Sequence, residues 1–341
     1  MESEKPHKRR ERYSGKNPRS FALKYKELAP EKYPETVAKV VASGKTPAGM
    51  HRSIMVDEIL EVLRPQQGEF GVDCTLGYGG HARELLQRLS PNGRLVGLDV
   101  DPIEIQKTEK RLRAEGFSEE VFGVYRSNFA GVLKVLAVEN RQGADVLLAD
   151  LGLSSMQIDD PARGFSVKFD GPLDMRMNPA KGKSAGEALA TLTAEQLEDV
   201  LRENADEPHA QRLAGVLAGR TFTGTQQLAK AIRHHLQKFD AEEQMLSVRR
   251  VFQALRILVN EEFLVLETLL RHLPNCMNAG GRIAIMSFHS GEDRRVKRAF
   301  EQYYQQGIFS AISSEVIRAS AKEKQENPRS TPAKLRWAIR S

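Results

Sequence analysis

Residues 73–81 read DCTLGYGGH, and this stretch is the strongest indication of the fold class of the chain. An apolar run at residues 70–72 precedes it and predicts a buried strand, whereas residues 81–89 have the spacing of an amphipathic helix. The glycines therefore lie where a strand turns into a helix. Because glycine permits positive φ angles and has no Cβ, the backbone can approach a ligand closely there. The pattern predicts a nucleotide-type cofactor at this turn.

A second acidic segment, residues 99–102 (DVDP), ends the next apolar run about one βαβ unit later. Asp99 follows the predicted strand at residues 94–98, where its carboxylate can accept hydrogen bonds from both hydroxyls of a ribose. The two segments together imply a cofactor with a free ribose diol.

The glycine pattern alone does not choose the cofactor, because Gly77, Gly79 and Ala82 also fit the loose pattern of nicotinamide enzymes. Asp73 favours another ligand. It stands where a dehydrogenase brings a pyrophosphate to the helix N-terminus, and a carboxylate there would repel phosphate. It suits the ammonium group of S-adenosylmethionine instead. The alternative, that Asp73 only caps the following turn, stays open at this point.

Strands and helices alternate strictly from residue 53 onward, which predicts an α/β fold with a doubly wound, mostly parallel sheet. Predicted strands cover residues 70–74, 94–98, 121–125 and 144–149, and predicted helices cover residues 55–63, 81–89, 103–114 and 129–137. Asp150 ends the fourth strand, and ligands of open α/β sheets bind beyond the carboxyl ends of the strands. We therefore expect Asp73, Asp99 and Asp150 to converge on one crevice.

The pattern changes after Asp150 to a polar loop rich in Gly and Pro, followed by helical segments without a strand. We assign residues 159–247 to an inserted helical subdomain, and residues 51–158 and 248–341 to the cofactor-binding domain. The sequence then predicts a long helix at residues 249–272, a strand at 282–288 and a helix at 292–304. Residues 313–317 and 335–339 are predicted to form a terminal antiparallel pair of strands.

Composition places the chain among cytoplasmic proteins. It has 341 residues, 40% of them hydrophobic, and no apolar stretch near the roughly 20 residues of a membrane span. The two cysteines, Cys74 and Cys276, cannot build a disulfide framework or a zinc cluster, so we expect no metal. The N-terminus has no hydrophobic segment typical of a secretory signal.

The positive charge is concentrated at the N-terminus. Residues 1–50 contain 12 Lys and Arg against 6 Glu, and this surplus of +6 equals the net charge of the whole chain. The segment has no periodic apolar positions, so we predict a flexible basic arm that contacts phosphate backbones in a salt-dependent way. A solvated tail that only aids solubility is an equally good interpretation of the charge.

Several segments together resemble the bacterial small-subunit ribosomal RNA cytosine-N4 methyltransferases, the RsmH or MraW family. The resemblance covers roughly residues 50–336. Besides the glycine turn and the DVDP corner, it rests on residues 51–55 (HRSIM), 150–160 (DLGLSSMQIDD), 163–166 (RGFS), 171–177 (GPLDMRM), 252–261 (FQALRILVNE), 287–290 (SFHS) and 292–294 (EDR). The shared order of so many segments makes the resemblance specific. It implies a seven-stranded Rossmann-like methyltransferase sheet, in which the helical insert recognises RNA.

The resemblance also implies the cofactor contacts. Gly79, Gly80 and His81 are expected to line the methionine end of S-adenosylmethionine, next to Asp73 and Gly77 of the same turn. Asp99 is expected at the ribose and Phe129 at the adenine, and Asp150 and Gln157 complete the set. From periodicity alone, Phe129 could equally be a core aromatic at a helix start, and His81 an ordinary first-turn residue.

The chain departs from the family in its second half. Residues 203–209 (ENADEPH) stand where the family usually has a Tyr-Gly-Glu-Glu string, and Gly291 replaces the usual leucine. Residues 247–250 (SVRR) replace a His-Pro-Ala-Thr-Arg-like approach to the following helix. We know no counterpart in the family pattern for the basic arm. Substrate contacts are therefore less well supported than cofactor contacts.

The N4 amine is a poor nucleophile, because its lone pair is delocalised into the cytosine ring. An enzyme must therefore orient the amine toward the methyl group and accept a proton during or after transfer. We hypothesise that Asp150 and the Ser154-Ser155 turn shape the reaction centre, with Ser287 and His289 at the neighbouring strand end. Alternatively, Asp150 serves the cofactor only, and the backbone of the loop orients the amine.

The target base must be single-stranded or extruded from its stack. Asp174 and Asn260 are candidates to bind the cytosine edge. Candidates to hold RNA phosphates are Arg163, Arg176, Arg256, Arg294 and Lys334. Each of these basic residues, taken singly, could equally be an ion-pairing surface residue.

Three functions stay open at this point: the ribosomal RNA methyltransferase, a ribosome-assembly factor that binds RNA without catalysis, and a nicotinamide oxidoreductase. The expected partner is small-subunit ribosomal RNA or the assembled small subunit, with no membrane. The sequence leaves a monomer and a homodimer open.

Overall fold

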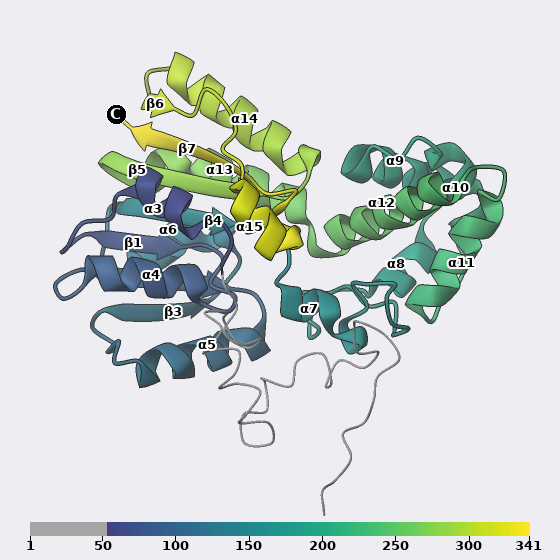
Figure 1. The fold of residues 1–341 in the computed structure, drawn as a ribbon, viewed down its shortest axis with the longest axis horizontal. Helices are drawn as coiled ribbons and strands as arrows, with labels where there is room; N and C mark the ends of the chain where they lie inside the picture. The colour runs from purple at the N-terminus through teal and green to yellow at the C-terminus, as the bar shows by residue number, and fades with distance from the viewer. Residues whose placement is uncertain (1–52) are drawn as a thin grey trace, which may run out of the picture. The chain divides into compact units, whose positions relative to one another are not determined.

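The computed structural model describes residues 53–341, with the backbone alone for Ser155 and Met156 (Figure 1). The predicted basic arm and residues 51–52 of the HRSIM segment lie outside the described residues.

A seven-stranded sheet forms the centre of the fold, with the strand order β3-β2-β1-β4-β5-β7-β6. β1 to β5 are parallel, and β7 runs antiparallel to both of its neighbours. The strands are β1 (Phe70–Asp73), β2 (Arg94–Asp99), β3 (Phe122–Arg126), β4 (Ala144–Asp150), β5 (Met277–Ser287), β6 (Phe309–Ile312) and β7 (Lys334–Arg340). The predicted doubly wound, mostly parallel sheet is confirmed.

Helices follow the parallel strands and cover both faces of the sheet. Alternate residues of β4 join different hydrophobic clusters, because successive side chains of a strand point to opposite faces. Leu147 packs in a cluster with helices α6, α13 and α14, whereas Leu148 packs in a cluster with α3, α4 and α5. These helices are α3 (Val56–Leu63), α4 (Gly80–Leu89), α5 (Pro102–Ala114), α6 (Val132–Val138), α13 (Glu262–Cys276) and α14 (Ser290–Gln305).

The segment between β4 and β5 forms a third hydrophobic cluster of its own, and Figure 1 shows its helices as a separate group. They are α8 (Ala185–Thr191), α9 (Ala194–Ala205), α10 (Ala210–Leu217), α11 (Thr225–His235) and α12 (Ala241–Asn260), preceded by the short α7 (Ser155–Asp159). The cluster extends to Leu255, because α12 passes without interruption through the boundary assigned at residue 248.

Two predicted elements are wrong. The single helix at residues 249–272 is broken at Glu261, whose φ of 52° lies in the left-handed region, so α12 and α13 are separate helices. The penultimate strand is β6 rather than residues 313–317. Those residues contribute an isolated bridge from Ile317 to Leu335 and a hydrogen bond from the Ser313 amide to the Trp337 carbonyl, whereas β6 pairs with residues 338–340 of β7.

Among the described residues, no helix is both long and apolar enough to span a membrane.

The short helices not yet named are η2 (Phe129–Gly131), η3 (Pro161–Arg163), α15 (Ala321–Glu326) and η4 (Pro328–Ser330).

Candidate active site

Three acidic residues lie at the carboxyl ends of three neighbouring strands. Asp99 ends β2, Asp73 ends β1 and Asp150 ends β4, and β1 pairs with both of the other strands. The three residues are far apart in the sequence, and the order of the parallel strands brings their carboxylates to one edge. The predicted convergence of the three acids at the carboxyl edge is confirmed.

The second βα unit holds the glycine turn in place. The amide of Gly77 donates to Asp99 Oδ2 at 2.7 Å, and its carbonyl accepts from the Thr108 hydroxyl of α5 at 2.6 Å. Gly79 has a φ of 73°, and a Cβ at this position would lie 2.6 Å from Thr108 Cγ2. The turn therefore requires glycine at residue 79 for its conformation and for space, and Gly80 begins α4 immediately after it.

Asp73 is almost fully buried, with 1% of its surface exposed. Its Oδ1 accepts the amide of Thr75 at 3.0 Å, whereas its Oδ2 has no hydrogen-bond partner in the described part of the chain. Burial raises the pKa of Asp73 to about 6, although the Thr75 amide opposes this shift. The turn-capping alternative therefore accounts for one carboxylate oxygen only, and the other is available to a ligand.

Asp99 has both carboxylate oxygens oriented by the backbone. Besides the Gly77 bond, Oδ1 accepts the amide of Asp101 at 2.8 Å. Burial raises the pKa of Asp99, with the two amides acting against it. Each oxygen retains a second lone pair, so the carboxylate can still accept ribose hydroxyls.

Asp150 is partly exposed, with 29% of its side chain accessible. Its amide donates to Thr75 Oγ1 at 2.7 Å, so Thr75 links the ends of β1 and β4. His81, the second residue of α4, places Nε2 3.5 Å from Asp150 Oδ2. The sequence did not single out Thr75, because a threonine after a strand carries no specific signal.

These residues fit S-adenosylmethionine. The cofactor carries an ammonium group, and the unpartnered oxygen of Asp73 is a buried acceptor without a cation. The glycine turn leaves backbone without side chains beside it, and the binding of ribose by Asp99 stays a prediction. Phe129 begins η2 and is partly buried against the core cluster of β1 and β4. Its predicted contact with adenine stays a prediction.

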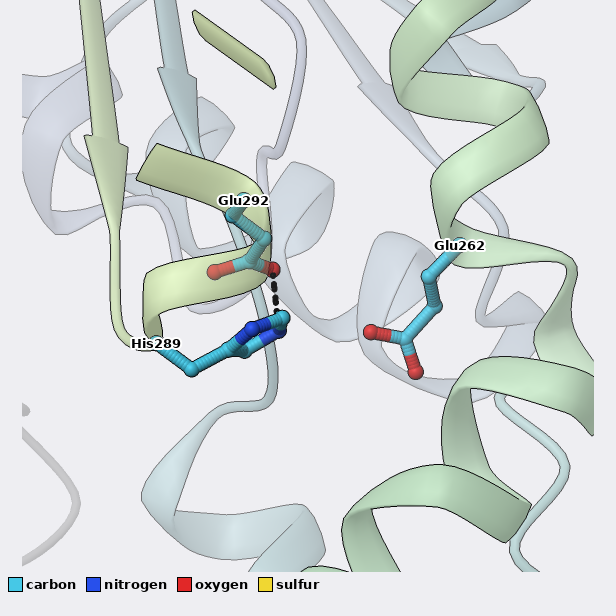
Figure 2. Close-up of side chains that lie close together, drawn as sticks. All are labelled: Glu262, His289 and Glu292. Carbon is cyan, nitrogen blue, oxygen red and sulfur yellow. Dashed lines mark ion pairs between the residues drawn. The ribbon is translucent and has the colours of Figure 1, made fainter. Parts of the chain in front are cut away.

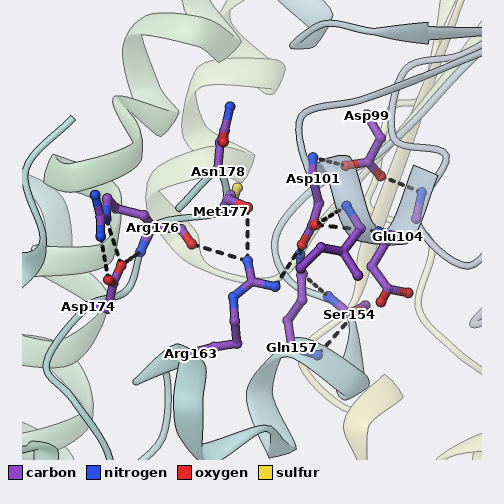
Figure 3. A network of polar contacts seen from close by, with 12 residues as sticks. Asp99, Asp101, Glu104, Ser154, Gln157, Arg163, Asp174, Arg176, Met177 and Asn178 are labelled. Atoms are coloured by element: carbon purple, nitrogen blue, oxygen red, sulfur yellow. Dashed lines mark hydrogen bonds and ion pairs between the residues drawn. The ribbon is translucent and has the colours of Figure 1, made fainter. Parts of the chain in front are cut away.

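Asp101 connects the cofactor edge to the loop that follows β4 (Figure 3). It is fully buried, caps α5 through the amide of Ile103 and accepts Gln157 Nε2 at 3.0 Å and Arg163 Nη1 at 2.8 Å. Burial alone would raise the pKa of Asp101, but the bonds from Arg163 and Gln157 lower it overall. The DVDP segment contained the signal for this residue, an Asp before a Pro at a helix start.

Most of the candidate RNA-binding residues are engaged within the protein. Arg163 also donates to the carbonyls of Arg176 and Met177 (Figure 3). Asn260 donates to Met175 O and accepts the amide of Met177. The remaining ion pairs are Arg176 with Asp174, Arg256 with Glu262, Arg294 with Asp206 and Lys334 with Asp293. Asp174 and Asn260 thus hold the loop in the structure, and base recognition by either stays a prediction.

The end of β5 carries a buried charged cluster (Figure 2). Glu292 accepts the amide of Phe288 at 2.9 Å and lies 3.3 Å from His289 Nε2. Glu262 completes a group of three residues with metal-ligand atoms within 4.8 Å of one another. However, Arg256 binds both oxygens of Glu262 at 2.8 Å. Because the guanidinium already balances this charge, the cluster gives no support for a metal centre.

The other candidate catalytic residues either end β5 or follow β4. Ser287 is buried at the end of β5, and its hydroxyl lies 3.5 Å from the Lys334 carbonyl. Ser154 accepts the amide of Gln157, and Ser155 begins α7. Gly291 is buried, and a Cβ there would lie 2.7 Å from Phe263 Cζ, so a leucine would displace that ring. Catalytic roles for the serines stay predictions.

Comparison with known proteins agrees with the resemblance. A model of the MraW methylase family matches residues 48–341. The ribosomal RNA small subunit methyltransferase H 1 of Lachnoclostridium phytofermentans is 49% identical, with 100% of this chain and 95% of the relative covered. The protein of the same name from Agathobacter rectalis is 46% identical, with both chains fully covered. The methyltransferase H 2 of Alkaliphilus metalliredigens is 46% identical, with 99% of each chain covered.

The family model does not match residues 1–47, in agreement with the absence of a counterpart in the family pattern. Two of the alignments with relatives nevertheless cover 100% of this chain and so include these residues. Identity across the full length, together with the acids and glycines at the sheet edge, leads to one conclusion: the chain belongs to the MraW methylase family.

Proposed function

We propose that this protein transfers a methyl group from S-adenosylmethionine to the N4 amine of a cytidine in small-subunit ribosomal RNA. The observation that carries the proposal is the buried, unpartnered oxygen of Asp73 among three acids at one sheet edge, in a chain whose relatives are small-subunit rRNA methyltransferases. The nicotinamide alternative is not favoured, because the family is one of methylases.

The choice of N4 over the ring carbon C5 is supported by the cysteines. Methylation at C5 of cytosine uses a thiolate that adds to the ring, and a thiolate requires a lowered pKa. Cys74 and Cys276 are both buried. Burial raises the pKa of Cys74 well above its ordinary value and that of Cys276 to about 12. Neither thiol suits that chemistry, whereas an amine requires only orientation and a proton acceptor.

We assign the role of proton acceptor to Asp150. When bound, S-adenosylmethionine supplies an electrophilic methyl group on a sulfonium that leaves as a neutral thioether. Asp73 holds the ammonium group and Asp99 the ribose. The N4–H bond breaks with its electrons remaining on nitrogen, and the proton goes to the carboxylate of Asp150, whose partial exposure lets it pass on to water.

The test uses small ribosomal subunits isolated from cells that lack the enzyme, incubated with protein and labelled S-adenosylmethionine. Mass spectrometry of the nucleosides should detect N4-methylcytidine. Formation of C5-methylcytidine or a methylated purine would refute the assignment of N4, and RNA binding without methyl incorporation would favour the assembly-factor alternative. We expect Asp150→Ala to abolish transfer, and near-normal turnover at saturating cofactor would reject the role of Asp150.

A further inference from the structure

We propose that His81 is a positioning residue for methyl transfer, which donates a hydrogen bond from Nε2 to Asp150 and thereby holds that carboxylate as the proton acceptor. The inference rests on the proposed function and adds to it a side chain that acts through Asp150 rather than on the cofactor alone.

The burial of His81 is the first observation. The residue is 7% exposed, and its Nε2 is buried without a hydrogen bond in the described part of the chain. A buried polar atom left without a partner costs about 1–3 kcal/mol. Asp150 Oδ2 lies 3.5 Å away, so a shift of a few tenths of an ångström would complete the bond. Catalytic hydrogen bonds are often long without substrate and shorten in the complex.

The second observation concerns the freedom of Asp150. Its main chain is fixed, because its amide binds Thr75 Oγ1 and the amide of Leu151 binds the Met286 carbonyl. Among the described side chains of residues 53–341, which leave out Ser155 and Met156, only that of His81 is found in an ion pair or hydrogen bond with its carboxylate. A donor on Oδ2 would restrict the carboxylate to one orientation and leave Oδ1 free to accept the proton of the amine.

The third observation is the surrounding charge. Asp73 and Asp99 lie at the ends of the two strands next along the sheet, so three carboxylates share this edge. Asp150 and Asp99 each help to raise the pKa of Asp73, whereas His81 opposes that rise. A hydrogen bond from His81 Nε2 would place a positive dipole next to the Asp150 carboxylate, where it offsets the repulsion among the three acids.

Replacement by the two amides tests the proposal directly. The amide nitrogen of glutamine can reach the place of Nε2, whereas that of asparagine matches Nδ1 and falls short of Asp150. We expect His81→Asn and His81→Leu to lower kcat about 10-fold to 100-fold. His81→Gln should recover most of the rate.

The measurements separate positioning from folding and from cofactor binding. Rates are measured on small ribosomal subunits with saturating S-adenosylmethionine, the affinity for S-adenosylhomocysteine by calorimetry, and folding by urea denaturation. The matched control is Arg83→Gln on the exposed side of α4, where the arginine pairs with Glu115 and with no other acid among the described residues, and it should behave as wild type.

Equal rates for the Gln and Asn variants would overturn the proposal, because only one of them can replace the Nε2 donor. Loss of cofactor affinity with kcat intact would overturn it too, since His81 would then serve the cofactor alone. If wild type methylates another nucleoside, the proposed function fails, yet the Gln to Asn ratio still decides the role of His81. If wild type transfers no methyl group, both fail.

Discussion

Charged side chains are paired differently at the carboxyl edge of the sheet and in the loop at residues 159–182. At the edge, Asp73, Asp99 and Asp150 have no Lys or Arg partner among the described residues. In and around the loop, by contrast, arginines are neutralised by internal carboxylates, as in the pairs of Arg163 with Asp101 and Arg176 with Asp174. The acids of the edge thus lack a basic partner among the described side chains, whereas the arginines of the loop hold its shape.

Residue type alone does not show whether a charged side chain is free to bind a ligand. Arg163 and Arg256 are 12% and 17% exposed and are bound by carboxylates, so binding an RNA phosphate would require each to leave its partner. Arg294 is 45% exposed and pairs with an exposed aspartate. Of these three arginines, Arg294 is the one best placed to contact phosphate. Three substitutions sharpen this contrast.

The largest effect is expected from Arg163→Ala. Removing the guanidinium leaves the fully buried Asp101 carboxylate without its cation, which should lower the free energy of unfolding by about 3–5 kcal/mol in urea denaturation. Because the pair lowers the folded-state pKa of Asp101, the stabilisation is present above its unfolded value of 3.8 and is lost as pH falls through the folded value. The difference between the two proteins should therefore shrink below about pH 4.

The control for this substitution is the double variant Asp101→Asn with Arg163→Ala. If the cost comes from a buried unpaired charge, the double variant should be more stable than Arg163→Ala alone. Equal stability of the single and double variants would show that the arginine contributes packing only, and the assignment of its charge to the fold would be wrong.

The next effect is expected from Asp73→Asn, which should stabilise the protein and weaken cofactor binding together. Burial raises the folded pKa of Asp73 from 3.8 to about 6, so ionisation costs the folded state up to about 3 kcal/mol at pH 7. The asparagine avoids this cost, and the gain should diminish as pH falls below about 7 and vanish below 3.8, where aspartate is mostly protonated in both states.

Calorimetry of the Asp73→Asn variant should show a loss of affinity for S-adenosylhomocysteine of about 10-fold to 100-fold, because a charge-assisted bond to the ammonium contributes about 1.5–3 kcal/mol. Undiminished affinity would mean that Asp73 does not bind the ammonium group. Asp73→Glu is not a suitable control, because the site is fully buried and a longer side chain would have to displace its neighbours.

The smallest effect on folding is expected from Arg294→Gln. Its pair with Asp206 is exposed on both sides, so the free energy of unfolding should change by less than about 1 kcal/mol. Affinity for ribosomal RNA should nevertheless fall, with the slope of log K against log salt reduced by about 1, as for one lost phosphate contact. An unchanged slope would remove Arg294 from the candidate RNA contacts.

The sequence was most informative where the signal is local. The order of strands and helices up to β4 follows from apolar runs of strand length and helical spacing. The break at Glu261 was not predictable, because the apolar pattern continues across it and only the left-handed residue separates α12 from α13. The choice of β6 was missed for a related reason. Short apolar segments near a chain end look alike until it is known which of them pairs with β7.

The glycine turn and the acids at the strand ends could be predicted from the amino-acid sequence alone, because each depends on residues close together in the chain and on the rule that parallel strands end at one edge. The methyltransferase class was indicated by the shared order of segments between residues 50 and 336. Only the tertiary structure decided which charges are free. Arg163 meets Asp101 across 62 residues, and His81 approaches Asp150 from another strand-helix unit. Such pairings depend on burial and on distance in space, so no local pattern in the chain contains them.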